Sequence, residues 1–241
     1  LQRLPGLKSG GNGQRFFDAG YDLPKPLIDV KGAPMFKRVL DNITDEYEGV
    51  EVVAIVRPDH VEKYSIDQKL KEALPNIEIV VTDGPTEGAA CTVMLAIDQY
   101  SEDEVLIANC DQIAEFNASL FHTFSTTSDG TILTFFSDNP EPKHSYVTVD
   151  SQGFLKELAE KRKISDVATV GVYHFSSQRE FSNAVKAMME ADDRINGEFY
   201  LAPVYNYYRG NVSCFDCTQM YGMGTPEELE AFKQTDYYEA L

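Results

Sequence analysis

The stretch Val105-Leu106-Ile107-Ala108-Asn109-Cys110-Asp111-Gln112 decides the fold of this chain. Its first four residues are apolar, and a short apolar run bounded by polar residues is typical of a strand buried on both faces. Asp111 closes the run, so the sequence predicts a carboxylate at the carboxyl end of a central strand, where the sites of α/β sheets lie. A helix N-cap is the other role open to this aspartate.

Similar apolar, β-rich runs lie on both sides of this stretch, at 50–56, 77–82, 131–136 and 168–175. Between most of the early runs, apolar residues recur at helical spacing after Pro34 (Met35, Phe36, Val39, Leu40, Ile43), after Pro58 (Val61, Ile66, Leu70, Leu74) and from Ala89 to Ile97. This alternation predicts an α/β fold, a Rossmann-like three-layer α/β/α sandwich around a mainly parallel mixed sheet.

The pattern changes beyond residue 140. Two short strands are predicted at 146–149 and 154–157, joined by the turn Asp150-Ser151-Gln152-Gly153, so we expect a small antiparallel insertion. A helix is predicted at about 178–191, and Thr225-Pro226-Glu227-Glu228 is a capping box that begins another. Because no linker, repeat or low-complexity tract interrupts the pattern, residues 1–241 are expected to form a single domain.

Composition indicates a cytoplasmic protein without a membrane partner. The chain has 241 residues, 43% of them hydrophobic, but no stretch approaches the ~20 apolar residues of a membrane span and no secretory pattern opens it. Its four cysteines, Cys91, Cys110, Cys214 and Cys217, are too few and too irregularly spaced for a disulfide framework. We therefore expect reduced thiols, and the lone C-x-x-C lacks the second pair that a zinc site needs.

The charge of the chain restricts its partners. Its formal net charge is -18, with 39 acidic against 21 basic residues, so most of the surface would repel a nucleic-acid backbone. This excludes nucleic acid as the expected partner. An anionic small molecule can still bind where a few lysines, arginines and backbone N–H groups gather, together with a divalent cation.

Two segments near the N-terminus could form such a place. In Gly10-Gly11-Asn12-Gly13-Gln14-Arg15 the glycines let the backbone approach phosphate oxygens closely. In Pro24-Lys25-Pro26-Leu27-Ile28 two prolines hold a lysine on a stiff segment, which suits a phosphate ligand. Taken alone, the first motif is equally compatible with a flexible glycine turn and the second with a surface lysine.

In combination with Val30-x-Gly32-x-Pro34-Met35, these motifs resemble the signature of the NDP-sugar pyrophosphorylase family, the sugar-phosphate nucleotidyltransferases of the NTP-transferase superfamily. The resemblance covers about residues 10–232 in family order, through Thr86-Glu87-Gly88-Ala89-Ala90, Asn109-Cys110-Asp111-Gln112, Glu160-Lys161, Ala168-Thr169-Val170-Gly171-Val172-Tyr173, Asn196-Gly197-Glu198-Phe199-Tyr200 and Gly224-Thr225-Pro226-Glu227-Glu228-Leu229. It implies the GT-A-type nucleotidyltransferase fold.

The resemblance implies that about residues 10–140 bind the nucleotide. Gly11, Gly13 and Arg15 match residues that hold the triphosphate, and Lys25 matches the lysine that neutralises charge at the reacting α-phosphate. Asp111 matches the aspartate that coordinates magnesium, so the implied cofactor is Mg²⁺.

The resemblance also implies that about residues 141–241 bind the acceptor. Lys161 matches the lysine that grips the acceptor's phosphate, and Gly171 and Glu198 match positions that line the sugar pocket. In the nucleotide half, Glu87 and Gly88 match the loop that faces the nucleobase and ribose.

The implied activity is transfer of a nucleoside monophosphate from a nucleoside triphosphate to a sugar phosphate or similar phosphorylated small molecule, with release of pyrophosphate. Such a product would be an activated precursor for polysaccharide or cell-surface glycan synthesis. This chemistry needs no Ser-His-Asp set. His60, His122, His144 and His174 are accordingly interpreted as surface or packing residues. The oligomeric state is left open, a homo-oligomer included.

The chain departs from the family pattern in two places. Residues 1–9 replace an apolar first strand, and Arg3, Pro5 and Lys8 are poorly suited to a buried parallel strand. Many relatives carry a second metal-binding aspartate where this chain has Gly222, and Asp216 is only a weaker candidate for that role.

Two other functions remain open at this level. A GT-A-type glycosyltransferase shares the architecture but presents a D-x-D pair, of which Cys110-Asp111-Gln112 offers one acid. A non-catalytic sensor would keep the fold and bind nucleotide without turnover. A nucleotidyltransferase would release pyrophosphate, a glycosyltransferase would release nucleoside diphosphate, and a sensor would release neither.

Overall fold

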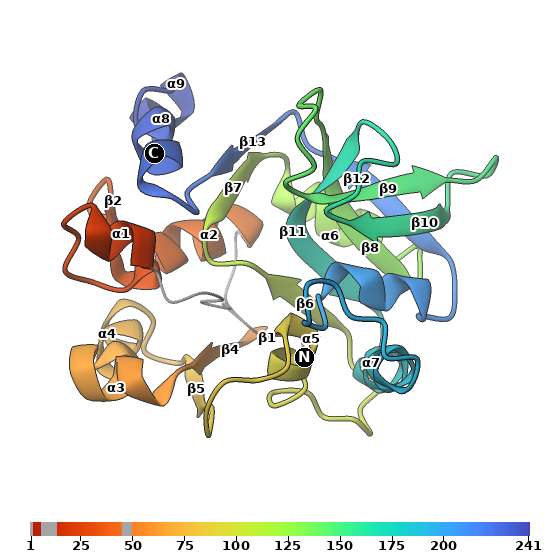
Figure 1. Ribbon diagram of the computed structural model, residues 1–241, viewed down its shortest axis with the longest axis horizontal. Helices are drawn as coiled ribbons and strands as arrows, with labels where there is room; N and C mark the ends of the chain where they lie inside the picture. The colour runs from red at the N-terminus through yellow and green to blue at the C-terminus, as the bar shows by residue number, and fades with distance from the viewer. Residues whose placement is uncertain (1, 6–13, 45–49) are drawn as a thin grey trace.

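A mixed β-sheet forms the centre of the molecule (Figure 1). The computed structural model describes the backbone of residues 2–5, 14–44 and 50–241, and the side chains of all of these except 2–5 and 14. Within these ranges the main sheet has nine strands, with seven in the order β10-β9-β11-β6-β1-β4-β5 and with β8 and β12 attached through β11. The first half supplies four mutually parallel strands, β1 (Gln2–Pro5), β4 (Val50–Val56), β5 (Glu78–Val81) and β6 (Val105–Ala108).

The second half of the chain supplies the other five strands of the main sheet, of which four pair antiparallel and the last runs parallel to its neighbour. Its strands are β8 (Gly130–Phe136), β9 (Ser145–Val149), β10 (Leu155–Glu160), β11 (Val167–Phe175) and β12 (Val212–Asp216). Strand β11 runs antiparallel to β6, β8 and β9, and β9 and β10 form the hairpin that the turn residues predict. Because β11 pairs with β6, the two halves share one sheet.

Alternating side chains of the sheet enter two separate hydrophobic clusters, which establishes three layers. In β6, Leu106 and Ala108 belong to one cluster and Val105 and Ile107 to the other. The first cluster also holds residues of α2 (Met35–Ile43), α4 (Ile66–Ala73), α6 (Ala118–Ser125) and α8 (Pro226–Phe232), and the second holds residues of α5 (Ala89–Val93), α7 (Gln178–Glu190) and the short 3₁₀ helix η2 (Ala202–Asn206). The predicted α/β fold is therefore confirmed.

The C-terminal segment returns to the N-terminal helices, as Figure 1 shows for α8 and α9 (Asp236–Ala240) beside α1 (Gln14–Asp18) and α2. Asn42 of α2 donates a hydrogen bond to Tyr237 of α9 over 3.1 Å. A small antiparallel sheet of β7 (Gln112–Glu115) and β13 (Gln219–Gly222) leads the chain there, and a second one joins β2 (Asp29–Val30) to β3 (Ala33–Pro34). This return places α8 close to the end of β6.

Two predicted helices are shorter than the apolar spacing indicates. The helix expected after Pro58 is divided into α3 (Pro58–Tyr64) and α4, because Ser65 between them adopts a left-handed conformation with φ of 50°. The helix expected over 89–97 ends at Val93, where the backbone closes tighter i→i+3 turns from Leu95 and Ala96.

The first strand forms despite its unfavourable composition. Strand β1 pairs in parallel with β4 over all four of its residues and with β6 at Arg3. Pro5 is its last residue, where the missing N–H costs the ladder least. The expectation that residues 1–9 would make a poor strand was therefore wrong for 2–5.

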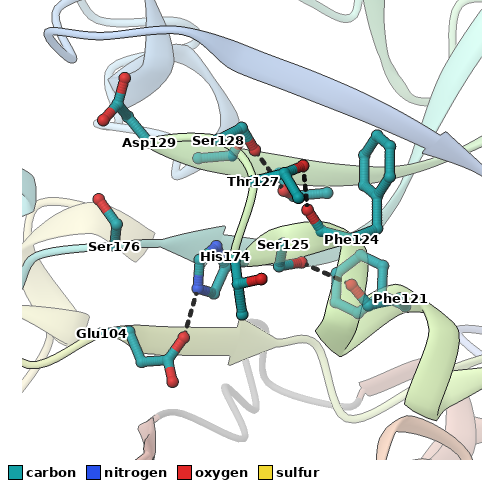
Figure 2. A network of polar contacts seen from close by, with 12 residues as sticks. Glu104, Phe121, Phe124, Ser125, Thr127, Ser128, Asp129, His174 and Ser176 are labelled. Atoms are coloured by element: carbon teal, nitrogen blue, oxygen red, sulfur yellow. Dashed lines mark hydrogen bonds and ion pairs between the residues drawn. The ribbon is translucent and has the colours of Figure 1, made fainter.

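Most of the histidines have the packing role that we expected. His174 of β11 is buried, and its Nε2 lies 2.8 Å from the Glu104 carboxylate, next to a set of hydroxyl-to-carbonyl hydrogen bonds at the end of α6 (Figure 2). The His122 Nε2 lies 2.9 Å from the Ile43 carbonyl oxygen. His144 differs, because it faces the site described below.

All four cysteines are reduced, and Cys110 and Cys217 are buried. Burial raises the pKa of Cys110 and of Cys217 to about 12, so neither is a thiolate at neutral pH. In the described part of the chain, no helix is both long enough and apolar enough to span a bilayer.

Candidate functional site

A cleft opens at the carboxyl end of β6 and over the middle of β11. Polar residues that directly follow β6 form its floor, and the loop before β9 and the segment before η2 form its walls. The residues that line it are Ala89, Asn109, Asp111, Gln112, Lys143, His144, Ser145, Glu160, Thr169, Gly171, Tyr173, Tyr200, Leu201 and Ala202. Both halves of the chain therefore contribute to one cleft, as expected for an edge of the sheet where parallel strands end.

Lys25 and Asp111 meet at the edge of this cleft. Lys25 opens the short 3₁₀ helix η1 (Lys25–Leu27), where Pro24 and Pro26 fix the backbone on both sides. Its Nζ lies 2.8 Å from the Asp111 carboxylate, and the two side chains are 16% and 22% exposed. Burial is the largest influence and lowers the pKa of Lys25, but the Asp111 carboxylate together with other nearby groups, Glu228 among them, outweighs it, so the pKa is raised. Lys25 is thus a fixed cation at neutral pH.

Glu228 approaches the same place from the first turn of α8. Its Oε2 accepts hydrogen bonds from the backbone N–H groups of Gly224, over 3.0 Å, and Thr225, over 3.1 Å, which completes the predicted capping box. A Cβ on Gly224 would lie 3.1 Å from this oxygen and 3.3 Å from Asp111 Oδ2. The Asp111 backbone is also joined to this segment, because its carbonyl oxygen accepts a 2.7 Å hydrogen bond from Met223 N–H.

Gly171 lets two amide side chains lie over the middle of β11. It has φ of 96°, and the pairing of β11 with β8 shifts register between Thr169 and Tyr173. A Cβ here would lie 2.2 Å from Gln112 Oε1 and 2.4 Å from Asn109 Nδ2. No larger residue fits without moving these amides, so Gly171 shapes the cleft floor.

Glu87 and Gly88 are held against the segment that leads to the cleft wall. Gly88 has φ of 144°, and a Cβ on it would lie 2.4 to 2.8 Å from backbone atoms of Phe199. The Glu87 carbonyl oxygen accepts a 2.9 Å hydrogen bond from Phe199 N–H, and its carboxylate lies 2.5 Å from the Arg194 guanidinium. The sequence patterns did not indicate this ion pair. The loop proposed for the nucleoside is therefore clamped to the acceptor side.

Lys161 reaches the cleft through Tyr200. The Lys161 Nζ donates a 2.6 Å hydrogen bond to the Tyr200 hydroxyl and lies 4.6 Å from the centre of its ring, and Tyr200 lines the cleft. This hydrogen bond raises the pKa of Lys161, and the nearby Glu198 carboxylate adds to the effect. Lys161 and Glu198 are both exposed, so they lie at the rim rather than in the floor.

Two titratable residues line the cleft although the sequence patterns gave neither of them a role in the site. Glu160 ends β10 and accepts a hydrogen bond from Ser145, and burial raises its pKa. His144 lies edge-on to Phe135 and Tyr146, and burial lowers its pKa, so it is neutral at pH 7. Only the position of Glu160 beside Lys161 gave a signal in the sequence, while nothing local marked His144.

Of the three residues expected to bind the triphosphate, only Arg15 lies among the residues that the structure describes. Gly11 and Gly13 lie outside the described residues. Arg15, on α1, is exposed and does not line the cleft. Its charge contributes to lowering the pKa of Glu227, after larger effects from the Glu227 backbone N–H and the Thr225 side chain. Arg15 therefore lies near enough to the first turn of α8 for its charge to act on Glu227.

A family model described as nucleotidyl transferase matches residues 7–202. The chain belongs to the nucleotidyl transferase family. The family predicted from the ordered motifs is thereby confirmed. Among curated relatives, the bifunctional protein GlmU of Methanocaldococcus jannaschii is 22% identical over 204 residues, which cover 78% of this chain and 47% of that protein. The chain thus spans less than half the length of this relative.

Solved structures agree on the fold of this family member. The nucleoside-diphosphate-sugar pyrophosphorylase from Vibrio cholerae RC9 has a TM-score of 0.81 and 22% identity, over 98% of this chain and 100% of that one. A UDP-glucose pyrophosphorylase solved with UDP-glucose has a TM-score of 0.73 and 14% identity, over 100% of this chain and 99% of that one. Such neighbours bind nucleotide and sugar ligands.

Members of this family generally use a divalent metal ion. Among the described residues, no group of three or more histidine, cysteine, aspartate or glutamate side chains is arranged to hold one. Asp111 and Glu228 nevertheless place two carboxylates around the point that a Cβ on Gly224 would fill, and hard oxygen ligands of this kind suit magnesium. Asp216 does not line the cleft, and its carboxylate accepts a 2.5 Å hydrogen bond from Thr134. The donor set therefore fits a cation that keeps several waters or phosphate oxygens.

Proposed function

We propose that this chain transfers a nucleoside monophosphate from a nucleoside triphosphate to a sugar phosphate or similar phosphorylated small molecule and releases pyrophosphate. The product would be an activated precursor for glycan synthesis. The observation that carries the proposal is the Lys25–Asp111 pair at the edge of a cleft built by both halves of a nucleotidyl transferase fold. When a lysine and a carboxylate are held side by side, the lysine can bind a phosphate and the carboxylate can bind the metal ion of that phosphate.

In this proposal about residues 10–140 hold the nucleotide. Gly11, Gly13 and Arg15 bind the triphosphate, and Glu87 and Gly88 face the nucleoside. Support comes from the place of α1, because the charge of Arg15 is felt by Glu227 in the first turn of α8. The close packing of Gly88 against the Phe199 backbone, which leaves no room for a side chain, fixes this loop beside the segment that leads to the cleft wall.

About residues 141–241 hold the acceptor. Lys161 binds the acceptor's phosphate, while Gly171 and Glu198 lie along the sugar pocket. Support comes from the 2.6 Å hydrogen bond between Lys161 and Tyr200, which ties the lysine to a residue of the cleft wall. An ammonium at the rim, held by a neutral hydroxyl rather than by a carboxylate, keeps its charge available for a phosphate.

The reaction is a single in-line displacement. An oxygen of the acceptor phosphate forms a bond to the α-phosphorus as the bond from that phosphorus to the β-bridging oxygen breaks, and pyrophosphate leaves with the bonding electrons. Lys25 leaves Asp111 for the charge that gathers on the α-phosphate, and Asp111 is then available as a metal ligand. A bound magnesium ion would screen the repulsion between the two anions. The residues need only align the reactants, since phosphate oxygens are already nucleophilic.

The test is a matrix of substrates. Five nucleoside triphosphates are each combined with a panel of phosphorylated sugars and alcohols in the presence of Mg²⁺, and pyrophosphate is measured. The proposal expects pyrophosphate only when both a nucleotide and an acceptor are present. Nucleoside diphosphate as the product would indicate glycosyl transfer instead, and binding of nucleotide without turnover for every pair would indicate a sensor.

A further inference from the structure

We propose that Glu228, besides capping α8, is the second carboxylate that holds the divalent cation bound at Asp111. This inference rests on the proposed function, because it concerns the cation that this reaction uses. The sequence assigns Glu228 only to a capping box, and Gly222 stands where a second metal-binding aspartate would be expected. The cation is held by Glu228 directly or through one of its waters.

The first observation is the space between the two carboxylates. The point that a Cβ on Gly224 would occupy lies 3.1 Å from Glu228 Oε2 and 3.3 Å from Asp111 Oδ2. Gly224 leaves this point empty of side-chain atoms. A residue with a Cβ would fill the gap that separates the two oxygens, so the glycine keeps a cradle open between them.

The second observation is that the capping box fixes the Glu228 carboxylate in this place. Two backbone N–H groups hold its Oε2, and a Cβ on Gly222 would lie 3.4 Å from its Cδ. The carboxylate thus lies against the bare backbone of Gly222. Within the described ranges, no further hydrogen bond to this carboxylate is present, so its remaining lone pairs can serve a cation or its water.

The third observation is the charge balance. Lys25 supplies one positive charge and contacts Asp111, whereas Asp111 and Glu228 supply two negative charges. One negative charge therefore remains uncompensated among the three groups. A divalent cation between the two carboxylates compensates this charge before any phosphate binds, and it balances both carboxylates once Lys25 moves to a phosphate.

Binding of Mn²⁺ alone tests the proposal without any nucleotide or turnover. Free Mn²⁺ is followed by its electron paramagnetic resonance signal during titration of the complete chain and of Asp111→Asn, Glu228→Gln, Gly224→Ala and Glu227→Gln. Glutamine at position 228 can still complete a capping box, so Glu228→Gln removes the charge but keeps the helix cap. Glu227→Gln is the matched control, because it removes a carboxylate from the same helical turn.

We expect Glu228→Gln to weaken Mn²⁺ binding by about tenfold, as loss of a metal-supporting group typically does, with the melting temperature unchanged. Asp111→Asn should weaken it at least as much, and Gly224→Ala should weaken it because its Cβ enters the cradle. Glu227→Gln should bind as the unsubstituted chain does.

Two results would overturn the inference. If Asp111→Asn weakens Mn²⁺ binding and Glu228→Gln does not, Glu228 is only a helix cap. If the unsubstituted chain binds no Mn²⁺ at millimolar concentration, the two carboxylates do not form a cation site. Neither result removes the proposed function, which is tested separately by pyrophosphate release.

Discussion

The Lys25 ammonium and the Asp111 carboxylate, 86 residues apart in the sequence, form a 2.8 Å ion pair at the carboxyl end of β6. Each group is the other's counterion while no substrate is present. In the proposed reaction, a nucleotide with its metal ion separates them, because the phosphate attracts the lysine and the metal attracts the aspartate. On this proposal the pair keeps the two groups aligned until substrate arrives.

Replacement of Lys25 should abolish most of the turnover. In Lys25→Ala, no fixed cation meets the charge on the α-phosphate, and loss of one such electrostatic group typically lowers kcat by about 100-fold or more. The measurement is the steady-state rate of pyrophosphate release. Lys71→Ala, an exposed lysine on α4, is the control and should keep its rate. Near-normal turnover in Lys25→Ala would contradict the assignment.

Replacement of Lys161 should affect acceptor binding more than turnover. In Lys161→Ala, the rim loses the ammonium that Tyr200 positions, so we expect KM for the acceptor to rise about tenfold, in line with loss of one charge-assisted hydrogen bond. The nucleotide KM should change little. Lys156→Ala, an exposed lysine on the same hairpin, provides the comparison. An unchanged acceptor KM in Lys161→Ala would assign the phosphate to another group.

Gly88→Ala should destabilise the fold. The new Cβ would collide with the Phe199 backbone, and the left-handed φ of 144° disfavours any side chain. We expect the free energy of unfolding to fall by at least about 2 kcal/mol, measured by urea denaturation. Gly84→Ala is the control, since nothing lies within 4 Å of its Cβ position. Equal stabilities for the two variants would show that the loop readily moves away from Phe199.

Glu160→Gln should gain stability relative to the unsubstituted chain as pH rises. Burial raises the pKa of Glu160 above its ordinary value of 4.5. Because this pKa is higher in the folded state than in the unfolded state, Glu160 contributes fully to the free energy of unfolding only below its pKa in the unfolded chain. The contribution is lost as pH rises through its pKa in the folded chain. Glutamine does not titrate and loses nothing. Unfolding free energies measured from pH 4 to 8 should therefore diverge in favour of Glu160→Gln, and a constant difference would contradict the raised pKa.

The sequence determined the sheet more fully than the helices. The runs at 50–56 and 105–108 are strands with those bounds, because apolar residues ended by polar ones leave little choice of register. The break at Ser65 was not predicted, since a left-handed serine carries no signal comparable to glycine. Strand β1 forms although its residues are poorly suited to a buried strand, because β4 and β6 pair with it on both sides. This pairing is a tertiary effect that the local sequence does not reveal.

The sequence indicated where two of the candidate residues would lie, but not how the candidates are connected. The strand rule brought Asp111 to the sheet edge, and the two prolines indicated a fixed Lys25. The link of Glu87 to Arg194 spans 107 residues, and only the folded chain reveals it. Glu228 was predicted as a helix cap, but its closeness to Asp111 depends on the path of β13 beside β7. Local patterns report local roles and miss those that tertiary contacts create.

The most direct test of the account is a phosphorus NMR spectrum of a complete reaction that contains the preferred nucleoside triphosphate, its acceptor and Mg²⁺. We predict equal amounts of free pyrophosphate and of a new diphosphate that joins nucleoside to acceptor, and neither signal with Lys25→Ala. Inorganic phosphate or nucleoside diphosphate in place of pyrophosphate, or an undiminished yield with Lys25→Ala, would contradict nucleotidyl transfer at the Lys25–Asp111 pair.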